Sequence, residues 1–261
     1  MGYRRIAVFG GIYSNDLALA ATLDDARQRG AEALFALGDL GAFGPHPDNV
    51  YPLLQQADVQ VVRGNYDISL ATGLEDCGCG YTDPRDNYFA EISYAYTLRH
   101  TSEANRRWLR TLPDCRRVEL GRYRLHMCHG SPRRVNEFLW ESTSPDCMLE
   151  MFCRDYQADI ILCTHTGIKW HRPLSYDRHV INVGVIGRPE NDGETHVWYA
   201  MLSAEPDLQV EFIPLYYDYQ ALAREMRQEA LPEAFVETIL TGWWTTCLEV
   251  LPGKERARSQ W

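Results

Sequence analysis

Three stretches near the start of the chain decide the fold: residues 5–16 (RIAVFGGIYSND), residues 33–41 (ALFALGDLG) and residues 59–67 (VQVVRGNYD). Each opens with a short, mostly apolar run and passes directly into glycine and polar residues. Runs of this length indicate buried strands. The segments between them have helical spacing, so the order strand, helix, strand, helix, strand predicts a largely parallel sheet with crossover helices.

Further elements follow in the rest of the chain. The strands that we expect there are residues 118–127 as a hairpin, residues 160–163, and residues 180–183, 196–202 and 210–215 as later strands of a second sheet. From residue 218 the pattern is helical and is broken by Pro232. We therefore expect a core of residues 1–217 and a helical extension of residues 218–261. The apolar stripe of this extension predicts packing against the core or against a second subunit in a homodimer.

The composition excludes several classes of protein. The 261 residues carry 26 Lys and Arg against 36 Asp and Glu, which gives a formal net charge of −10. An acidic chain has no general attraction for a nucleic acid duplex or an anionic membrane. Its apolar runs are far shorter than the roughly 20 residues of a membrane span. Eight cysteines without a signal-peptide pattern predict reduced thiols and a cytoplasmic location.

Four residues with metal-ligating side chains follow the predicted strands. Asp39, Asn65, His129 and His165 each stand at the carboxyl end of an expected strand. Ligands of α/β sheets bind at this edge, where the ends of parallel strands meet. We therefore expect these four side chains to lie together.

Five sequence words surround these residues and occur in a recognisable order. They are residues 37–41 (LGDLG), 62–67 (VRGNYD), 129–133 (HGSPR), 163–167 (CTHTG) and 182–189 (NVGVIGRP). In this order and spacing they resemble the calcineurin-like metallophosphoesterase superfamily, in its small bacterial phosphodiesterase branch. The resemblance covers residues 5 to about 217 and implies a four-layer α/β/β/α sandwich, here with the C-terminal helical extension.

The resemblance also implies one complete metal site. Members of the family hold two ions, and the ligands of one of them correspond to Asp39, Asn65, His129 and His165. Two imidazoles, a carboxylate and an amide oxygen suit Zn, Mn or Fe. We therefore expect one divalent or trivalent ion as the cofactor, bound by these residues.

The private ligands of the second ion are replaced. Gly11, Tyr13 and Gly167 stand where the family has these ligands, and Tyr66 stands where it has the catalytic histidine. A second metal ion is therefore not expected. Tyr13 could be a phenolate ligand, a hydrogen-bond donor to the substrate, or a plug over the lost site. His171, beyond Gly167, is a candidate compensating ligand.

The remaining candidate residues complete the expected site. As catalytic residues we expect Tyr66, Asp67, Tyr13 and Arg133, with the Tyr66 phenol protonating a leaving group. As substrate-binding residues we expect Asn15, Gly130 and Arg188, with Arg133 and Arg188 able to hold a phosphate. Cys77 and Cys79 form a Cys-x-Cys pair that could bind a soft metal or form a redox disulfide.

Three functions are compatible with these residues. The first is hydrolysis of a small phosphorylated molecule, a phosphodiester or nucleotide-like substrate, through one metal ion. The second is an inactive, phosphoesterase-like binding protein, because several positions of the family's site have changed. The third is non-hydrolytic redox chemistry at a mononuclear ion, since a phenol beside iron is redox-competent.

Overall fold

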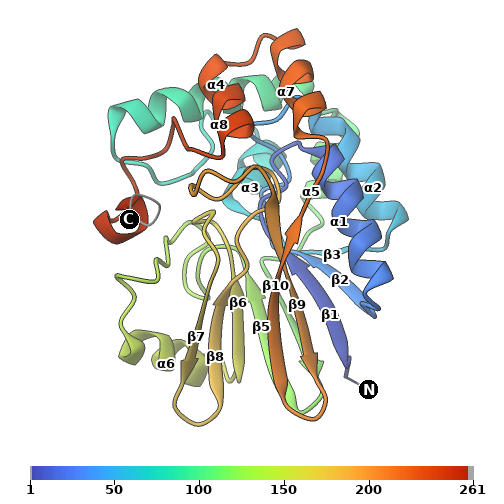
Figure 1. Ribbon diagram of the computed structural model, residues 1–261, viewed down its shortest axis with the longest axis vertical. Helices are drawn as coiled ribbons and strands as arrows, with labels where there is room; N and C mark the ends of the chain where they lie inside the picture. The colour runs from blue at the N-terminus through green and yellow to red at the C-terminus, as the bar shows by residue number, and fades with distance from the viewer. Residues whose placement is uncertain (1, 258–261) are drawn as a thin grey trace.

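Two five-stranded sheets form the centre of the computed structural model, which describes residues 2–257 (Figure 1). In spatial order, the first sheet contains β10 (Leu208–Leu215), β9 (Val197–Ala204), β1 (Arg5–Phe9), β2 (Ala33–Ala36) and β3 (Gln60–Val61). The second contains β4 (Cys115–Leu120), β5 (Tyr123–Cys128), β6 (Ile160–Cys163), β8 (Arg178–Asn182) and β7 (Trp170–Leu174).

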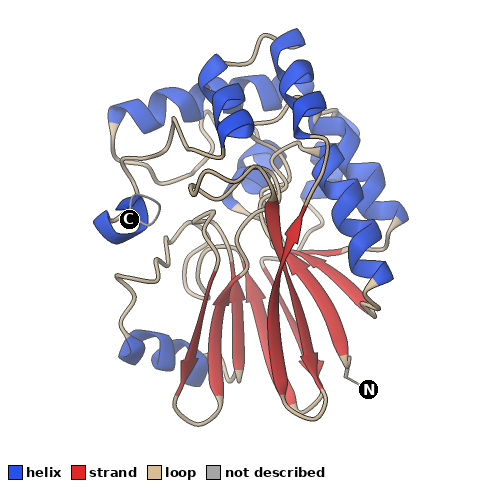
Figure 2. Ribbon diagram, viewed as in Figure 1, coloured by secondary structure: helices blue, strands red, loops and turns tan. Residues whose placement is uncertain are grey.

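Helices surround the two sheets (Figure 2). They are α1 (Asp16–Gln28), the 3-10 turn η1 (Pro47–Asn49), α2 (Val50–Gln56), α3 (Asn65–Thr72), α4 (Pro84–His100), α5 (Glu103–Leu109), α6 (Asp146–Asp155), α7 (Tyr219–Gln228), α8 (Glu233–Thr241) and α9 (Gly253–Ala257). Local chemistry sets several of their starts. The side chains of Asn15, Ser102 and Asp218 accept backbone N–H groups at the first turns of α1, α5 and α7.

The alternation of side chains along the strands separates the layers. In β1, Ile6 and Val8 point into a core between the two sheets, whereas Ala7 and Phe9 point into the core under the helices. On the outer face of the second sheet, Phe152 of α6 packs in a third cluster. The order is helix, sheet, sheet, helix, so the expected four-layer sandwich is confirmed.

The predicted arrangement of the strands is wrong in one respect. β9 and β10 belong to the first sheet, because β9 pairs antiparallel with β1 and places Ala200 opposite Val8. Each sheet therefore combines parallel and antiparallel pairs. The sequence of an apolar strand does not indicate which distant strand it pairs with, and this explains the error. β7 was not expected as a strand.

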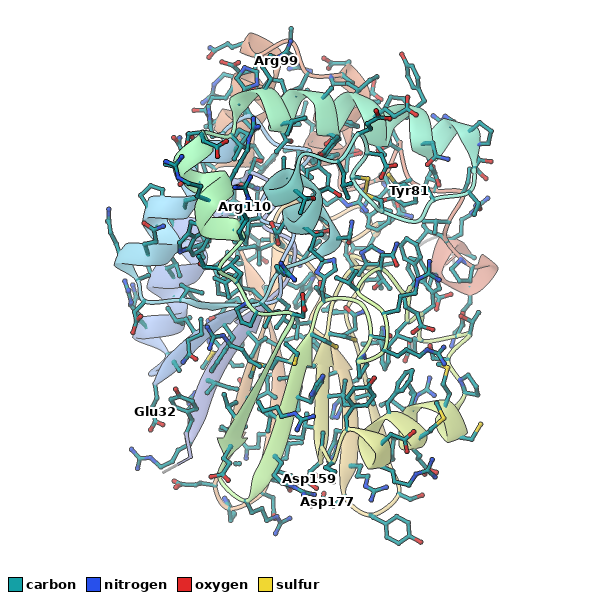
Figure 3. All side chains as sticks on the ribbon, turned by 180° about the vertical axis from the view of Figure 1, so that it is seen from behind. Glu32, Tyr81, Arg99, Arg110, Asp159 and Asp177 are labelled. Atoms are coloured by element: carbon teal, nitrogen blue, oxygen red, sulfur yellow. A yellow bond between two sulfur atoms is a disulfide. The ribbon has the colours of Figure 1, made fainter. Side chains whose placement is uncertain are left out.

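The parallel strands converge at one end of the molecule. In the first sheet β1, β2 and β3 run in the same direction, as do β5, β6 and β8 in the second. The loops after these strands lie under α4, α7 and α8 (Figure 1). Figure 3 places Tyr81 at this end, and Asp159 and Asp177 at the opposite end.

The C-terminal helices pack on their own chain. Leu222 and Met226 of α7 and Phe235 and Ile239 of α8 are buried in the same core as α1. Among the described residues after 217, Trp243 is the one large apolar side chain that is exposed, by 39%. A homodimer through this segment, and the division at residue 217, stay predictions. None of the described helices has the length and apolar character needed to cross a membrane.

Candidate metal centre

Three metal-ligating side chains meet above the sheets. The carboxylate of Asp39 and the imidazoles of His129 and His165 are buried, and their ligand atoms all lie within 4.8 Å of one another. His129 Nε2 lies 3.2 Å from Asp39 Oδ2 and 3.1 Å from His165 Nδ1. The three residues follow β2, β5 and β6, so the structure brings together strand ends from both sheets.

The two histidines have different surroundings. His129 Nδ1 lies 2.6 Å from the carbonyl oxygen of Leu37, which only accepts, so this nitrogen carries the proton and Nε2 faces the cluster. Burial alone would lower the pKa of His129, but the carboxylate of Asp39 raises it above its ordinary value. Burial and the charge of His129 lower the pKa of His165 to about 3, so this ring is neutral at neutral pH.

Asp67 holds the loop that carries Asp39. Its carboxylate accepts the backbone N–H groups of Asp39 (2.8 Å), Gly64 (2.8 Å) and Leu40 (3.0 Å). Burial and the neighbouring charge of Asp39 raise the pKa of Asp67 to about 6, against the effect of these donors. Because both of its oxygens are occupied by backbone donors, Asp67 positions Asp39. The expected catalytic role of Asp67 stays a prediction beside this positioning contact.

A close backbone approach at Gly64 completes the arrangement. A Cβ atom at this position would lie 2.2 Å from Asp39 Oδ1 and 2.9 Å from His129 Cε1. The backbone of Gly64 is extended, so the reason for glycine here is space and not an unusual dihedral angle. The loop after β3 can therefore pass directly against two of the three clustered residues.

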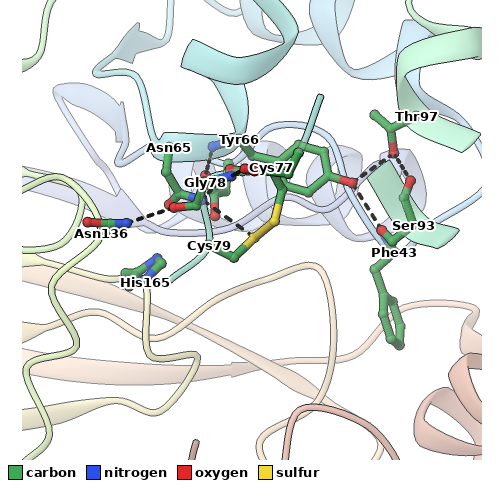
Figure 4. The surroundings of a disulfide bond; sticks show 12 residues. Phe43, Asn65, Tyr66, Cys77, Gly78, Cys79, Ser93, Thr97, Asn136 and His165 are labelled. Atoms are coloured by element: carbon green, nitrogen blue, oxygen red, sulfur yellow. Dashed lines mark hydrogen bonds between the residues drawn. A yellow bond between two sulfur atoms is a disulfide. The ribbon is translucent and has the colours of Figure 1, made fainter. Parts of the chain in front are cut away.

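Asn65 is held by the loop that contains the two cysteines (Figure 4). Its Nδ2 donates to the carbonyl oxygen of Cys77 at 3.0 Å and lies 3.6 Å from Cys79 Sγ. Its Oδ1 is buried and has no hydrogen-bond partner. Cys77 and Cys79 form a disulfide, which is one of the two alternatives left open for this pair and departs from the general expectation of reduced thiols.

The Tyr66 side chain turns away from the cluster. Its hydroxyl group lies 3.1 Å from Ser93 Oγ and donates to Thr97 Oγ1 at 3.4 Å, on the side of the ring away from His165 (Figure 4). Only its backbone N–H reaches the ligands, where it donates to Asp39 Oδ1. Burial also raises the pKa of this phenol. The expected role of Tyr66 as the acid for a leaving group stays a prediction, although its hydroxyl group is bonded to α4 in this structure.

Tyr13 lies beside the cluster as expected. A Cβ atom at Gly11 would lie 2.7 Å from Tyr13 Cε1 and Cζ, so the tyrosine ring fills the space that a side chain at position 11 would need. Burial is the main cause that raises the pKa of Tyr13, while the nearby Arg188 lowers it. The three roles left open for Tyr13, a phenolate ligand, a hydrogen-bond donor and a plug, stay predictions.

A small pocket opens next to the ligands, with a cavity volume of about 60 Å³. Asp39, His165 and Arg188 line its polar side. Its aromatic wall consists of Tyr13, Phe43, Tyr66, Tyr81, Phe89 and Phe235. Sequence reasoning missed Tyr81, Phe89 and Phe235, because they lie outside the strand ends and no local pattern distinguishes them from core residues.

Two other candidates have structural roles. Arg133 pairs with Glu137 and lies over the ring of Phe152, outside the pocket. Asn15 caps α1 through its oxygen and donates its amide to the carbonyl oxygen of Gly187. The catalytic role expected of Arg133 and the substrate contact expected of Asn15 stay predictions.

Gly130 and His171 are also occupied elsewhere. A Cβ atom at Gly130 would lie 2.5 Å from the carbonyl oxygen of Val135, so glycine lets its own loop close, and the expected substrate contact stays a prediction. His171 lies on β7 with its Nε2 3.0 Å from His179 Nδ1, and within residues 2–257 it does not join the cluster of metal-ligating side chains.

The chemistry of the cluster fits a metal ion. His129 Nε2, His165 Nδ1 and Asp39 Oδ2 face the same space, and a metal ion bound there would take the lone pair of Nε2 in place of a second proton on His129. The buried Asn65 Oδ1 lacks a partner, which is costly for a polar atom unless something binds it. Nitrogen and oxygen donors of this kind suit Zn, Mn or Fe, so the residues present fit the expected ion.

Comparisons with known proteins agree with the fold. The calcineurin-like phosphoesterase superfamily domain matches residues 5–206. Uncharacterized protein MJ0912 of Methanocaldococcus jannaschii is 26% identical over 251 residues, which cover 91% of this chain and 98% of the relative. Hypothetical protein PH1004 from Pyrococcus horikoshii OT3 is 24% identical with a TM-score of 0.76, and a metallophosphoesterase from Sphaerobacter thermophilus is 23% identical with a TM-score of 0.70. Each alignment covers 92% of this chain and 99% of the solved one.

Proposed function

Because the chain belongs to the calcineurin-like phosphoesterase superfamily, we propose that it is a phosphoesterase that works with one metal ion, Zn, Mn or Fe. The observation that carries the proposal is the convergence of Asp39, His129 and His165, with ligand atoms within 4.8 Å. Asn65 is the fourth ligand in this proposal, through its unpartnered Oδ1. When bound, the ion supplies a charge that polarises a phosphoryl oxygen and lowers the pKa of a water molecule.

The protein residues prepare this centre before a substrate arrives. The carbonyl oxygen of Leu37 fixes the orientation of His129, and Asp67 fixes the backbone of Asp39. Such supporting contacts keep ligands in place and tune their basicity. The protonated phenol of Tyr13 lies on the pocket wall, where it can donate a hydrogen bond to an oxygen of the substrate.

The pocket favours a small phosphorylated molecule with an organic group. Its polar side carries the metal ligands and Arg188, while Phe43, Phe89 and Phe235 form an apolar wall. A flat or apolar group packs well against aromatic rings, whereas its phosphate needs the polar side. A phosphodiester or nucleotide-like compound combines these two properties, and we propose this substrate class, with the phosphoryl group in the cavity of about 60 Å³ and the organic group extending beyond it.

The test measures metal content and turnover on one set of proteins. The full chain, purified without a chelator or a metal-binding tag, is expected to hold about one equivalent of metal and to hydrolyse bis(p-nitrophenyl) phosphate. His129→Ala and His165→Ala should lose both the metal and the turnover. His100→Ala is the matched control, because this exposed histidine bonds only within α4. Equal turnover by all four proteins would refute the proposal.

A second function is favoured by the position of Tyr66. The hydroxyl group of Tyr66 is bonded to Ser93 on α4 and is directed away from the clustered ligands. A protein that binds a phosphorylated ligand without cleaving it needs no acid for a leaving group. About one metal equivalent combined with no turnover on mono- and diesters would favour this binding function.

A further inference from the structure

Arg188 carries a buried charge for which the fold supplies no counter-ion. Its side chain lies in the segment after β8, and the residue is only 6% exposed. None of the ion pairs within residues 2–257 involves Arg188, and its Nε has no hydrogen-bond partner. An arginine cannot shed its proton to escape this cost. A buried guanidinium without a paired anion destabilises the fold, and a bound anion would remove this cost.

Aromatic rings surround this guanidinium. Arg188 Cζ lies 3.6 Å from the centre of the Trp244 ring, 5.8 Å from that of Tyr13 and 5.9 Å from that of Phe43. A cation over an aromatic face is stabilised, but the contact replaces only part of the lost hydration. These rings supply no anion, and within residues 2–257 no acceptor bonds the N–H groups of Arg188.

Arg188 also lines the pocket of the metal centre. Arg188 lines the same cavity as Asp39 and His165, so an anion in the cavity can reach both the guanidinium and the clustered ligands. A Cβ atom at Gly167, two residues after His165, would lie 3.5 Å from Arg188 Nη2 and 3.0 Å from Trp244 Cη2. The two side chains therefore fill the space beside Gly167.

The C-terminal segment holds Arg188 in this position. The indole Nε1 of Trp244 donates to the carbonyl oxygen of Pro189 at 2.8 Å, and its backbone N–H donates to Asn191 Oδ1 at 2.8 Å. Trp244 is thus bonded to the segment that directly follows Arg188 while its ring contacts the guanidinium. Residues beyond the family match, which ends at 206, shape this wall of the pocket.

We propose that Arg188, held by Trp244 of the C-terminal segment, is an anion-binding residue that takes two oxygens of a phosphoryl group next to the metal ligands. The proposal rests on the proposed function for the identity of its ligand. In this proposal Arg188 holds a fixed positive charge beside Gly167. Trp244 is a positioning residue that keeps the guanidinium there. A guanidinium presents two parallel N–H groups to two phosphoryl oxygens, which an ammonium group cannot reproduce.

The test titrates inorganic phosphate into the full chain, both with its metal and after chelator treatment, by calorimetry. Arg188→Met keeps an apolar stem of similar length but removes the charge, and we expect it to weaken phosphate binding at least tenfold in both states. Arg188→Lys should recover only part of the affinity, and Trp244→Leu should weaken binding without removing the charge. Arg63→Met is the control, since this partly exposed arginine pairs with Asp114.

A second measurement separates a ligand role from a structural one. In phosphate-free buffer the thermal stability of Arg188→Met should equal or exceed that of the wild type, because the variant buries no unpaired charge. Phosphate should raise the Tm of the wild type and leave that of Arg188→Met unchanged. Equal phosphate affinity of the two proteins, or a variant less stable than the wild type without phosphate, would overturn the proposal.

The outcomes also distinguish this proposal from the proposed function. Phosphate binding that depends on Arg188, in a protein that never turns over an ester, would refute the hydrolase and keep the anion site. The opposite result is turnover that depends on His129 while Arg188→Met changes neither turnover nor phosphate affinity. That result would keep the hydrolase and refute the anion site.

Discussion

Replacing Gly64 by alanine tests how closely the loops of the metal centre approach each other. The added Cβ would lie 2.2 Å from Asp39 Oδ1, whereas real Cβ atoms essentially never approach below 3.0 Å. The carboxylate or the loop must therefore move by at least 3.0 − 2.2 = 0.8 Å. Functional sites need their groups placed within about 0.5 Å, so this shift is large enough to disturb metal binding.

The expected consequences are a weaker metal site and a moderately less stable fold. Overpacking of a close contact costs about 1–3 kcal/mol. For a chain of this size each kcal/mol lowers the Tm by about 2–4 °C. Because the backbone of Gly64 is extended, alanine brings no dihedral strain, and the whole effect is steric.

Two assays on matched variants measure these effects. Urea unfolding followed by circular dichroism gives the free energy of unfolding, and elemental analysis gives the metal equivalents per chain. Gly253→Ala is the control, because a Cβ there meets no atom within 4 Å. Full metal content together with wild-type stability in Gly64→Ala would refute the reasoning, since the contact with Asp39 could not then exist as described.

Three further predictions concern residues around the site and in the second sheet. Asp67→Asn should weaken metal affinity about 10–100-fold, because an amide cannot accept all three N–H groups that Asp67 accepts, and a competition titration would show unchanged affinity if this is wrong. Tyr66→Phe should keep turnover within about twofold while costing about 1 kcal/mol in urea unfolding, through the lost bond to Ser93; a loss of about a thousandfold would restore Tyr66 as the acid. Burial lowers the pKa of His126 to about 4, below the value near 6.5 of the unfolded chain, so the unfolded state binds more protons between these values. Stability should therefore fall as the pH drops from about 6.5 to about 4, and His126→Gln should flatten this dependence; an identical slope in both proteins would contradict it.

The C-terminal segment forms part of the surroundings of the candidate site. The family match ends at residue 206, yet Phe235 lines the pocket from beyond it and Trp244 packs on the pocket residue Arg188. Truncating this segment would therefore remove part of the pocket wall as well as core packing. For the same reason, a shortened chain that ends after β10 would not test the activity of the whole protein.

The resemblance to the family implied the layers of the fold, whereas the grouping of the clustered side chains was predictable from local signals. Asp39, His129 and His165 each follow a short apolar strand, and strand ends of parallel sheets meet at one edge. The alternation of Ile6 and Val8 with Ala7 and Phe9 likewise follows from the geometry of a strand with two buried faces. Spacing along the chain was therefore enough to group these residues.

The roles of the other residues depended on the tertiary structure. Asp67 and Tyr66 lie close to Asn65 in the sequence, but one is occupied by backbone N–H groups and the other points into α4. Arg188 and Trp244 are 56 positions apart, and neither has a local pattern that reveals their contact. The direction of a side chain and its distant partners follow from how whole elements pack, whereas the sequence alone determines only which residues end each strand.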